Sequence, residues 1–273
     1  EPYAYRPLIP AATEEEAAMA ALNIGLKMFD AQSCGRPAAI IVEPIISAGG
    51  VIVPPKCYME GLRKAADDRQ MLLIFDEAQT AFGRLGVPFG MDYHGVQPDI
   101  VTLSKTLGGG LPLSATVTSD AIEQSAHEKG FTFYTSHVSD PLPARVGLAV
   151  LRTIQEDKLV ERGATMGTYL RARLLELQQK YEAIGDVRGA GMLIGVELVK
   201  DRQTREPHHA LGAVTTQRCF ELGLSMNIRR RKERGSVWRI APPLTVTEEE
   251  IDRGIAILDQ ALKDGLDELA LGN

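Results

Sequence analysis

Short apolar runs that end at an ionisable residue constrain the fold of this chain more than any other feature. Three such runs occur, at residues 38–42, 71–75 and 100–103. The ionisable groups at or just after their ends are Glu43, Asp76 and Lys105. Continuous apolar runs of this length are typical of strands that are buried on both faces. Because strands alternate with helices along the chain, the pattern predicts a largely parallel sheet with these three groups at one edge.

Helical periodicity fills much of the remaining chain. Helices are predicted at residues 13–31, 58–69, 144–155 and 159–181, at 211–222, and from 247 onward. Two helix starts have the spacing of a capping box, Thr13 with Glu16 and Thr247 with Glu250. Further strands are predicted at residues 115–118, 193–199, 224–228 and 237–241. The glycine-rich stretches at residues 83–97 and 185–191 are predicted to be loops.

A change in pattern near residues 151–160 divides the chain into two parts. We predict an α/β fold in which residues 1–153 form part of a large domain with a mostly parallel sheet. Residues 154–273 are predicted to form a smaller α+β domain. The chain has 273 residues, of which 44% are hydrophobic, and this is enough for a sizeable core.

Composition excludes several classes of function. The net charge of −6 argues against a general binder of nucleic acid or anionic membranes. No apolar run is long enough to span a bilayer, and no signal peptide is visible. The cysteines are few and far apart, at positions 34, 57 and 219. Their spacing gives neither a disulfide framework nor a metal site, so we expect a reducing, cytoplasmic compartment.

Lys105 is the candidate nucleophile. At the mouth of a buried strand, desolvation disfavours the ammonium form and makes the amine more reactive towards a carbonyl. A lysine that forms a Schiff base suits pyridoxal phosphate, which needs a carboxylate near its ring nitrogen, and Asp76 is the candidate. The alternatives are a surface lysine beside a turn for Lys105, and a helix cap or metal ligand for Asp76.

Arg239 lies inside the predicted strand at residues 237–241. Burial of a guanidinium is costly unless an anion pairs with it. The anion is either a substrate carboxylate or an internal Asp or Glu, and spacing alone leaves both open. The basic run at residues 229–234 is predicted to be a solvated loop, with a phosphate or acidic partner as the alternative.

Four segments resemble the class III aminotransferases, which are pyridoxal-phosphate enzymes of the aspartate-aminotransferase fold (fold type I). They are EPIISAGG at 43–50, FDEAQT at 75–80, TLSKTLG at 102–108 and RIAPPLT at 239–245. Within that family, residues 133–143 and 223–228 resemble the 2,2-dialkylglycine decarboxylases. The resemblance runs from near residue 1 to about residue 262.

The resemblance implies a role for each matching residue. Lys105 would form the Schiff base with the cofactor and move a proton, and Asp76 would pair with the pyridinium nitrogen. Gln79 would lie near the cofactor's phenolic oxygen and the substrate carboxylate. Arg239 would bind the substrate carboxylate.

Residues 133–143 imply a partner and an ion. Ser136 matches a residue that contacts the cofactor phosphate of the neighbouring subunit, which implies a homodimer or a higher homo-oligomer. Ser136, Val138 and Asp140 match residues that help to hold a potassium ion. The family's N-terminal portion, which supplies the phosphate-binding glycines and a ring-stacking aromatic residue, has no counterpart here. We therefore expect either a separate N-terminal polypeptide or a chain that is one piece of a longer protein.

The reaction implied is a decarboxylating transamination. A 2,2-dialkylglycine and pyruvate would give a ketone, CO2 and L-alanine. Ala48, Ala81 and Leu85 depart from the family pattern. The alternatives are an ordinary ω-aminotransferase that acts on 4-aminobutyrate or ornithine, and a non-catalytic truncated chain that needs a complementing N-terminal portion.

Overall fold

The computed structural model describes residues 9, 11–35, 37–226 and 236–271. The chain forms two compact units, which we name the first and the second unit. The first unit comprises Glu1–Ile45, Val53–Phe82 and Pro88–Lys158. The second unit comprises Ile46–Ile52, Gly83–Val87 and Leu159–Asn273. Two short segments of the N-terminal half therefore pack with the C-terminal part of the chain.

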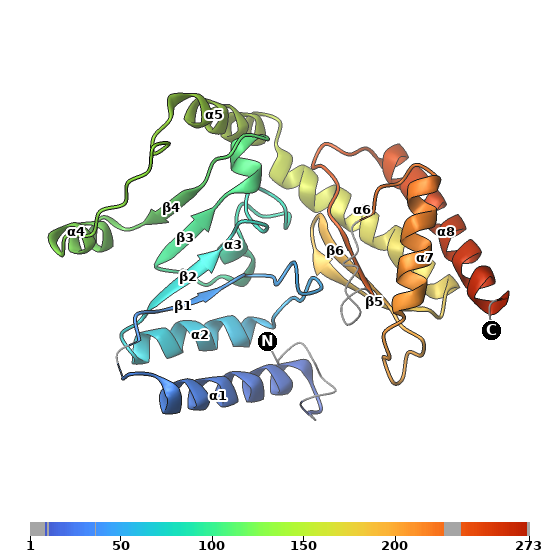
Figure 1. Cartoon of the computed structure of the whole chain (residues 1–273), viewed down its shortest axis with the longest axis horizontal. Coiled ribbons are helices and arrows are strands. Elements are labelled where there is room, and N and C mark those ends of the chain that lie inside the picture. The colour runs from blue at the N-terminus through green and yellow to red at the C-terminus, as the bar shows by residue number, and fades with distance from the viewer. Residues whose placement is uncertain (1–8, 10, 36, 227–235, 272–273) are drawn as a thin grey trace. The chain divides into compact units, whose positions relative to one another are not determined.

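The first unit contains a four-stranded sheet in the order β1-β2-β3-β4 (Figure 1). Its strands are β1 (Ala39–Val42), β2 (Leu72–Asp76), β3 (Ile100–Leu103) and β4 (Ala115–Thr118). The first three strands are parallel, and β4 pairs with β3 in the antiparallel direction. The predicted mostly parallel sheet is thus confirmed. The expected burial of its strands on both faces is not found, because Ile41 of β1 is 63% exposed and buried residues alternate with half-buried ones along β2 and β3. Leu73 and Phe75 of β2 are completely buried.

Helices α1 (Glu14–Gln32) and α2 (Lys56–Asp68) pack against each other, and α2 also packs against β1 and β2 (Figure 1). The N–H of Glu16 donates to the Thr13 hydroxyl at 3.2 Å, as expected for the helix start. The unit also contains α3 (Gly90–His94), η3 (Lys105–Gly108), α4 (Asp120–Glu128) and α5 (Pro141–Glu156). The predicted loop at 83–97 therefore includes one short helix, and α4 was not predicted.

The second unit is an antiparallel sheet, β5-β6-β7, with three long helices (Figure 1). The strands are β5 (Ile184–Ala190), β6 (Leu193–Leu198) and β7 (Val237–Ile240). The helices are α6 (Leu159–Lys180), α7 (His209–Glu221) and α8 (Glu248–Leu271). Trp238 is completely buried and its indole N–H donates to the Thr216 hydroxyl at 2.8 Å. Burial of this large ring with its polar atom satisfied anchors β7 to α7.

The predicted loop at residues 185–191 is wrong, because most of it belongs to β5. Gly189, which interrupts the apolar pattern, allows two backbones to approach closely. A Cβ at Gly189, whose φ is +135°, would lie 2.1 Å from the carbonyl oxygen of Leu193. The predicted strand at 224–228 is also not found, since residues 224–226 lie in no strand and residues 227 and 228 fall outside the described part. The basic run at 229–234 falls outside it too.

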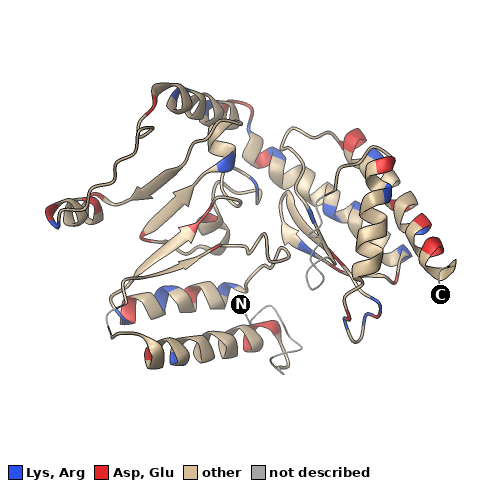
Figure 2. Ribbon diagram, viewed as in Figure 1, with Lys and Arg blue, Asp and Glu red and all other residues tan. Residues whose placement is uncertain are grey.

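Opposite charges are interspersed along α6 and α8, and α7 carries both signs near its C-terminal end (Figure 2). Some of them form ion pairs that link these helices. Lys180 of α6 lies 2.7 Å from Asp259 of α8, and Arg218 of α7 lies 2.7 Å from Asp264 of α8. No helix within the described ranges combines the length and the apolar character needed to cross a membrane.

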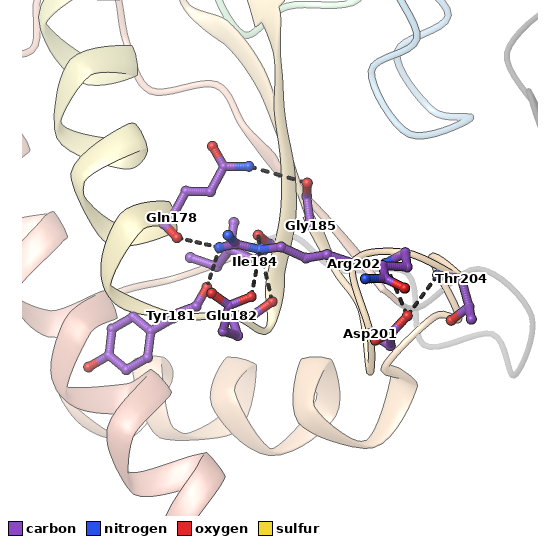
Figure 3. A network of polar contacts seen from close by, with 9 residues as sticks. Gln178, Tyr181, Glu182, Ile184, Gly185, Asp201, Arg202 and Thr204 are labelled. Atoms are coloured by element: carbon purple, nitrogen blue, oxygen red, sulfur yellow. Dashed lines mark hydrogen bonds and ion pairs between the residues drawn. The ribbon is translucent and has the colours of Figure 1, made fainter.

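Arg202 caps the C-terminal end of α6 (Figure 3). Its Nε donates to the carbonyl oxygens of Glu182 at 3.2 Å and Ile184 at 3.1 Å. Its Nη2 donates to the carbonyl of Tyr181 at 2.9 Å and also to that of Gln178. The last carbonyls of a helix have no partner within the helix, so one guanidinium satisfies several of them at once.

We expect Arg202→Ala to lower the free energy of unfolding by about 2 kcal/mol, because carbonyls at the helix end lose a charged donor. Urea unfolding followed by circular dichroism measures the change. Arg171→Ala, at an exposed position of α6, is the matched control and should change stability by less than about 0.5 kcal/mol. Equal effects of the two substitutions would contradict the capping role.

Candidate active site

Asp76 and Lys105 follow neighbouring parallel strands, as predicted. Asp76 is the last residue of β2 and pairs with Thr102 of β3. Thr102 lies three positions before Lys105 in the chain. Asp76 Oδ1 accepts hydrogen bonds from the N–H of Ala78 at 3.0 Å and from the Thr102 hydroxyl at 3.3 Å. The carboxylate is therefore fixed at the edge of the sheet. Thr102 is a partner that the sequence alone did not reveal, although its place one strand away follows from the register.

Lys105 begins η3 in a left-handed backbone conformation, with φ at +51°. Residues other than glycine rarely adopt this backbone conformation, which costs on the order of 1 kcal/mol. Such strain concentrates at functional positions. Lys105 is exposed in the described structure, so the predicted desolvation of its amine is wrong. The turn itself is anchored, because Leu107 packs with Val101 and Leu103 in a buried apolar cluster.

Glu77 is a buried clamp that sequence reasoning missed. Its side chain is 1% exposed and accepts three hydrogen bonds. The donors are the Thr80 hydroxyl at 2.6 Å and the N–H groups of Gly90 at 2.7 Å and Met91 at 2.9 Å. Burial raises the pKa of the Glu77 carboxyl, against the effect of these three donors. Glu77 thus ties the turn that follows Asp76 to the start of α3.

Gln79 lies half-buried within this turn, between the two clamped residues Glu77 and Thr80. Its position is thereby fixed three residues after Asp76. The one signal for the clamp was an acidic residue next to an apolar run, and that signal does not identify its partners.

His94 fastens the other end of α3. Its Nε2 lies 2.8 Å from the carbonyl oxygen of Pro44, so Nε2 carries the proton and donates it. The ring is 2% exposed and meets the ring of Tyr93 edge-on at 5.0 Å. Burial lowers the pKa of His94, against the hydrogen bond to Pro44. The neutral ring therefore holds α3 against the loop that follows β1.

The lowered pKa of His94 gives a pH dependence with a definite sign. Unfolding exposes a histidine that binds a proton more readily, so the stability is present above about pH 6.5 and is lost as the pH falls. We expect the free energy of unfolding of the wild type to fall by up to about 1.4 kcal/mol per pH unit more than that of His94→Asn. Urea unfolding between pH 7.5 and 5.5 measures this. His127→Asn, at an exposed position of α4, should keep the wild-type slope, and an unchanged slope in His94→Asn would contradict the prediction.

Arg239 lies in the second unit, on β7. Its Nη1 donates to the hydroxyl of Ser47 at 3.4 Å, and Ser47 is 1% exposed. Ser47 belongs to the segment Ile46–Ile52, which joins the second unit from the N-terminal half of the chain. Sequence reasoning identified Arg239 but not Ser47, because the two are far apart along the chain.

The segment predicted to contact phosphate and potassium precedes α5. Ser136 and Val138 are exposed, and Asp140 is the N-cap residue of α5. The Asp140 carboxylate lies 2.9 Å from Nδ1 of His137. Ser136 and Val138 lie in one turn and Asp140 directly follows it, and the potassium site stays a prediction.

The chain belongs to the class III aminotransferase family, whose profile (aminotransferase class-III) matches residues 3–262. It is 48% identical to an uncharacterized aminotransferase of Schizosaccharomyces pombe, over 88% of this chain and 54% of that protein. It is 40% identical to a leucine/methionine racemase of Thermococcus litoralis, over 83% of this chain and 50% of that protein. The chain thus spans about half the length of these curated relatives.

The fold agrees with that family. A thermostable omega transaminase variant from Pseudomonas jessenii superposes with a TM-score of 0.87 at 32% identity. The match covers 97% of this chain and 59% of that structure. The predicted aspartate-aminotransferase-like α/β fold, fold type I, is therefore confirmed.

Pyridoxal phosphate is the cofactor of class III aminotransferases, and the residues at the sheet edge fit it. The amine of Lys105 is accessible to an aldehyde. Asp76 accepts both of its hydrogen bonds from the described residues at Oδ1, which leaves Oδ2 for a ring N–H. An amine and a fixed carboxylate on adjacent strand ends are the pair that a protonated pyridine aldehyde requires.

Proposed function

We propose that this protein acts as a pyridoxal-phosphate-dependent transaminase of small amino acids and 2-oxo acids. The observation that carries the proposal is the fixed Asp76 carboxylate beside the strand that leads to Lys105. When bound, the cofactor supplies an electron sink for the bonds at the substrate's α-carbon. Lys105 would attach the cofactor through its amine and move a proton, and Asp76 would keep the proton on the ring nitrogen.

Arg239 is the proposed partner of the substrate carboxylate. A planar guanidinium can hold a carboxylate through two parallel hydrogen bonds, and this fixes orientation as well as position. Arg239 would retain the carboxylate that it binds, whereas a carboxylate held by Gln79 and Lys105 would be the one released as CO2.

The finer proposal is decarboxylating transamination of the 2,2-dialkylglycine type. Residues 133–143, with their resemblance to the dialkylglycine decarboxylases, support it. Each turnover would convert one dialkylglycine and one pyruvate into one ketone, one CO2 and one L-alanine, which conserves the amino group. The second candidate is ordinary ω-transamination, and the similarity to the omega transaminase from Pseudomonas jessenii supports it.

The proposed assembly is a homodimer or higher homo-oligomer, completed by an N-terminal portion of the family type. Exposed aromatic side chains before α5 support an association. Phe131 is 66% exposed, Phe133 69% and Tyr134 83%. Exposed aromatic side chains that lie close along the chain are typical of an interaction surface. Within the same segment, Ser136 would reach a cofactor phosphate, and Ser136, Val138 and Asp140 would bind potassium through oxygen atoms.

Product analysis separates the two candidates. The cofactor-loaded protein, with a complementing N-terminal polypeptide supplied where needed, is incubated with 2-aminoisobutyrate and pyruvate. The decarboxylating reaction gives CO2, acetone and alanine in equal amounts. Alanine formed from 4-aminobutyrate or ornithine, with no CO2 from 2-aminoisobutyrate, supports the ω-aminotransferase instead. If no amino group is transferred from any of these donors, the result supports a non-catalytic chain.

A further inference from the structure

Two arginines of the second unit flank a glycine across the three-stranded sheet. Arg188 of β5 stands opposite Gly195 of β6, and Gly195 stands opposite Arg239 of β7. Residues that stand directly opposite each other in antiparallel strands point to the same face of the sheet. The side chains of Arg188 and Arg239 therefore project from one face, on either side of a position that has no side chain.

The segment Ile46–Ile52 lies over this gap. Its ends are joined by two hydrogen bonds of 3.0 Å between Ile46 and Ile52. A Cβ at Gly195 would lie 2.9 Å from Cβ of Val51 and 3.1 Å from the carbonyl oxygen of Gly50. Val51 is completely buried and has a φ of +52°, which a β-branched residue adopts only where its surroundings enforce it. The missing side chain at position 195 thus admits the loop.

Arg188 binds the backbone of this loop. Its Nε and Nη2 both donate to the carbonyl oxygen of Gly50, at 3.0 and 2.8 Å. Its Nη1 donates to the carboxylates of Asp186, at 3.0 Å, and Glu197. Asp186 and Glu197 stand opposite each other on the same face, two positions along from Arg188 and Gly195. Because two carboxylates neutralise it, Arg188 is not itself a site for a substrate anion.

A tight turn links Gly50, which Arg188 binds, to Ser47. The N–H groups of Gly50 and Val51 both donate to the carbonyl oxygen of Ser47, at 3.2 and 3.1 Å. Ser47 in turn presents its buried hydroxyl to Nη1 of Arg239 at 3.4 Å. One chain of contacts therefore runs from Arg188 through the loop to the guanidinium of Arg239.

We propose that Arg188 is a positioning residue for the substrate-carboxylate site. By holding the carbonyl of Gly50 it keeps the Ile46–Ile52 loop and the Ser47 hydroxyl in place against Arg239. The guanidinium of Arg239 is then held in one orientation before a carboxylate arrives. This inference rests on the proposed role of Arg239 as the carboxylate-binding residue.

Two variants disturb the loop in different ways. Arg188→Lys keeps the positive charge but cannot make both hydrogen bonds to Gly50. Gly195→Ala leaves the ion pairs of Arg188 untouched and pushes against Gly50 and Val51, so it tests the same idea if the lysine variant does not fold. Arg202→Lys is the matched control, because Arg202 also binds backbone carbonyls of the second unit but caps α6 (Figure 3).

The first readout is amide hydrogen exchange, which needs no turnover. In both loop variants, peptides that cover residues 46–52 are expected to exchange about 10-fold faster, while the end of α6 keeps its wild-type rate. Arg202→Lys should give the reverse pattern. Wild-type exchange of the loop in both Arg188→Lys and Gly195→Ala would overturn the proposal.

The second readout compares an amino donor that has a carboxylate with one that lacks it. For alanine, kcat/KM of the cofactor-loaded loop variants is expected to fall about 10- to 100-fold, chiefly through KM. For isopropylamine it should change less than about 3-fold, since this amine makes no contact that requires Arg239. Equal losses for the two amines would overturn the positioning role. A wild type that turns over neither these two amines nor 2-aminoisobutyrate, 4-aminobutyrate or ornithine would refute the proposed function, and loop exchange would still decide whether Arg188 holds the loop.

Discussion

Replacement of Lys105 by alanine is expected to lower transaminase turnover by at least about 10³-fold, because one amine both attaches the cofactor and moves the proton. The loss should be chemical rather than structural. Lys105 is exposed, and alanine at the same φ of +51° carries the same backbone strain. Stability should therefore change by less than about 1 kcal/mol. Steady-state kinetics and urea unfolding measure the two effects.

The chain offers a close control for this substitution. Lys158 is also exposed and also has a φ of +51°, at the end of the first unit. Lys158→Ala should retain wild-type turnover. If Lys105→Ala kept more than about a tenth of the activity, the result would contradict the covalent and general acid–base roles proposed for this amine.

Asp76→Asn is the second large effect that we expect, a fall in kcat of about 10²- to 10³-fold. An asparagine can still accept the hydrogen bonds from Ala78 and Thr102 at Oδ1. It carries no charge, however, and presents an NH2 group where the carboxylate has Oδ2. The ring nitrogen would then lose its proton, and with it the positive charge that draws electrons from the substrate.

Thr102→Val tests whether the fixed position of this carboxylate matters as well as its charge. It removes one of the two hydrogen bonds to Asp76, so we expect a loss of about 5-fold, equivalent to about 1 kcal/mol. Both variants are measured by kcat and by the dissociation constant of the cofactor. An Asp76→Asn protein with an effect no larger than that of Thr102→Val would contradict the assigned role.

Sequence alone predicted the part of the fold that depends on local pattern. The apolar runs that became β1, β2 and β3 were found within about a residue, and Asp76 and Lys105 were placed at neighbouring strand ends. The loop predicted at 185–191 failed because glycine has two uses. It marks turns, and it also permits the close backbone approach that Gly189 makes to Leu193.

The surroundings of the candidate site could not be predicted in the same way. Glu77 finds its donors at Gly90 and Met91, and Ser47 meets Arg239 across 192 positions of sequence. Such contacts exist only after the chain has folded, and no periodicity encodes them. The desolvation expected for Lys105 failed for a related reason. A strand end was assumed to be covered, whereas η3 presents the side chain at the surface of the described chain.

The most direct test of the account is the chemical identity of the residue that binds the cofactor. The protein, with its N-terminal complement where needed, is loaded with pyridoxal phosphate, reduced with borohydride and digested for peptide mass analysis. We predict one phosphopyridoxyl group per chain, carried by the peptide that contains Lys105. A label on a different lysine, or no label at all in protein that has bound the cofactor, would contradict the account.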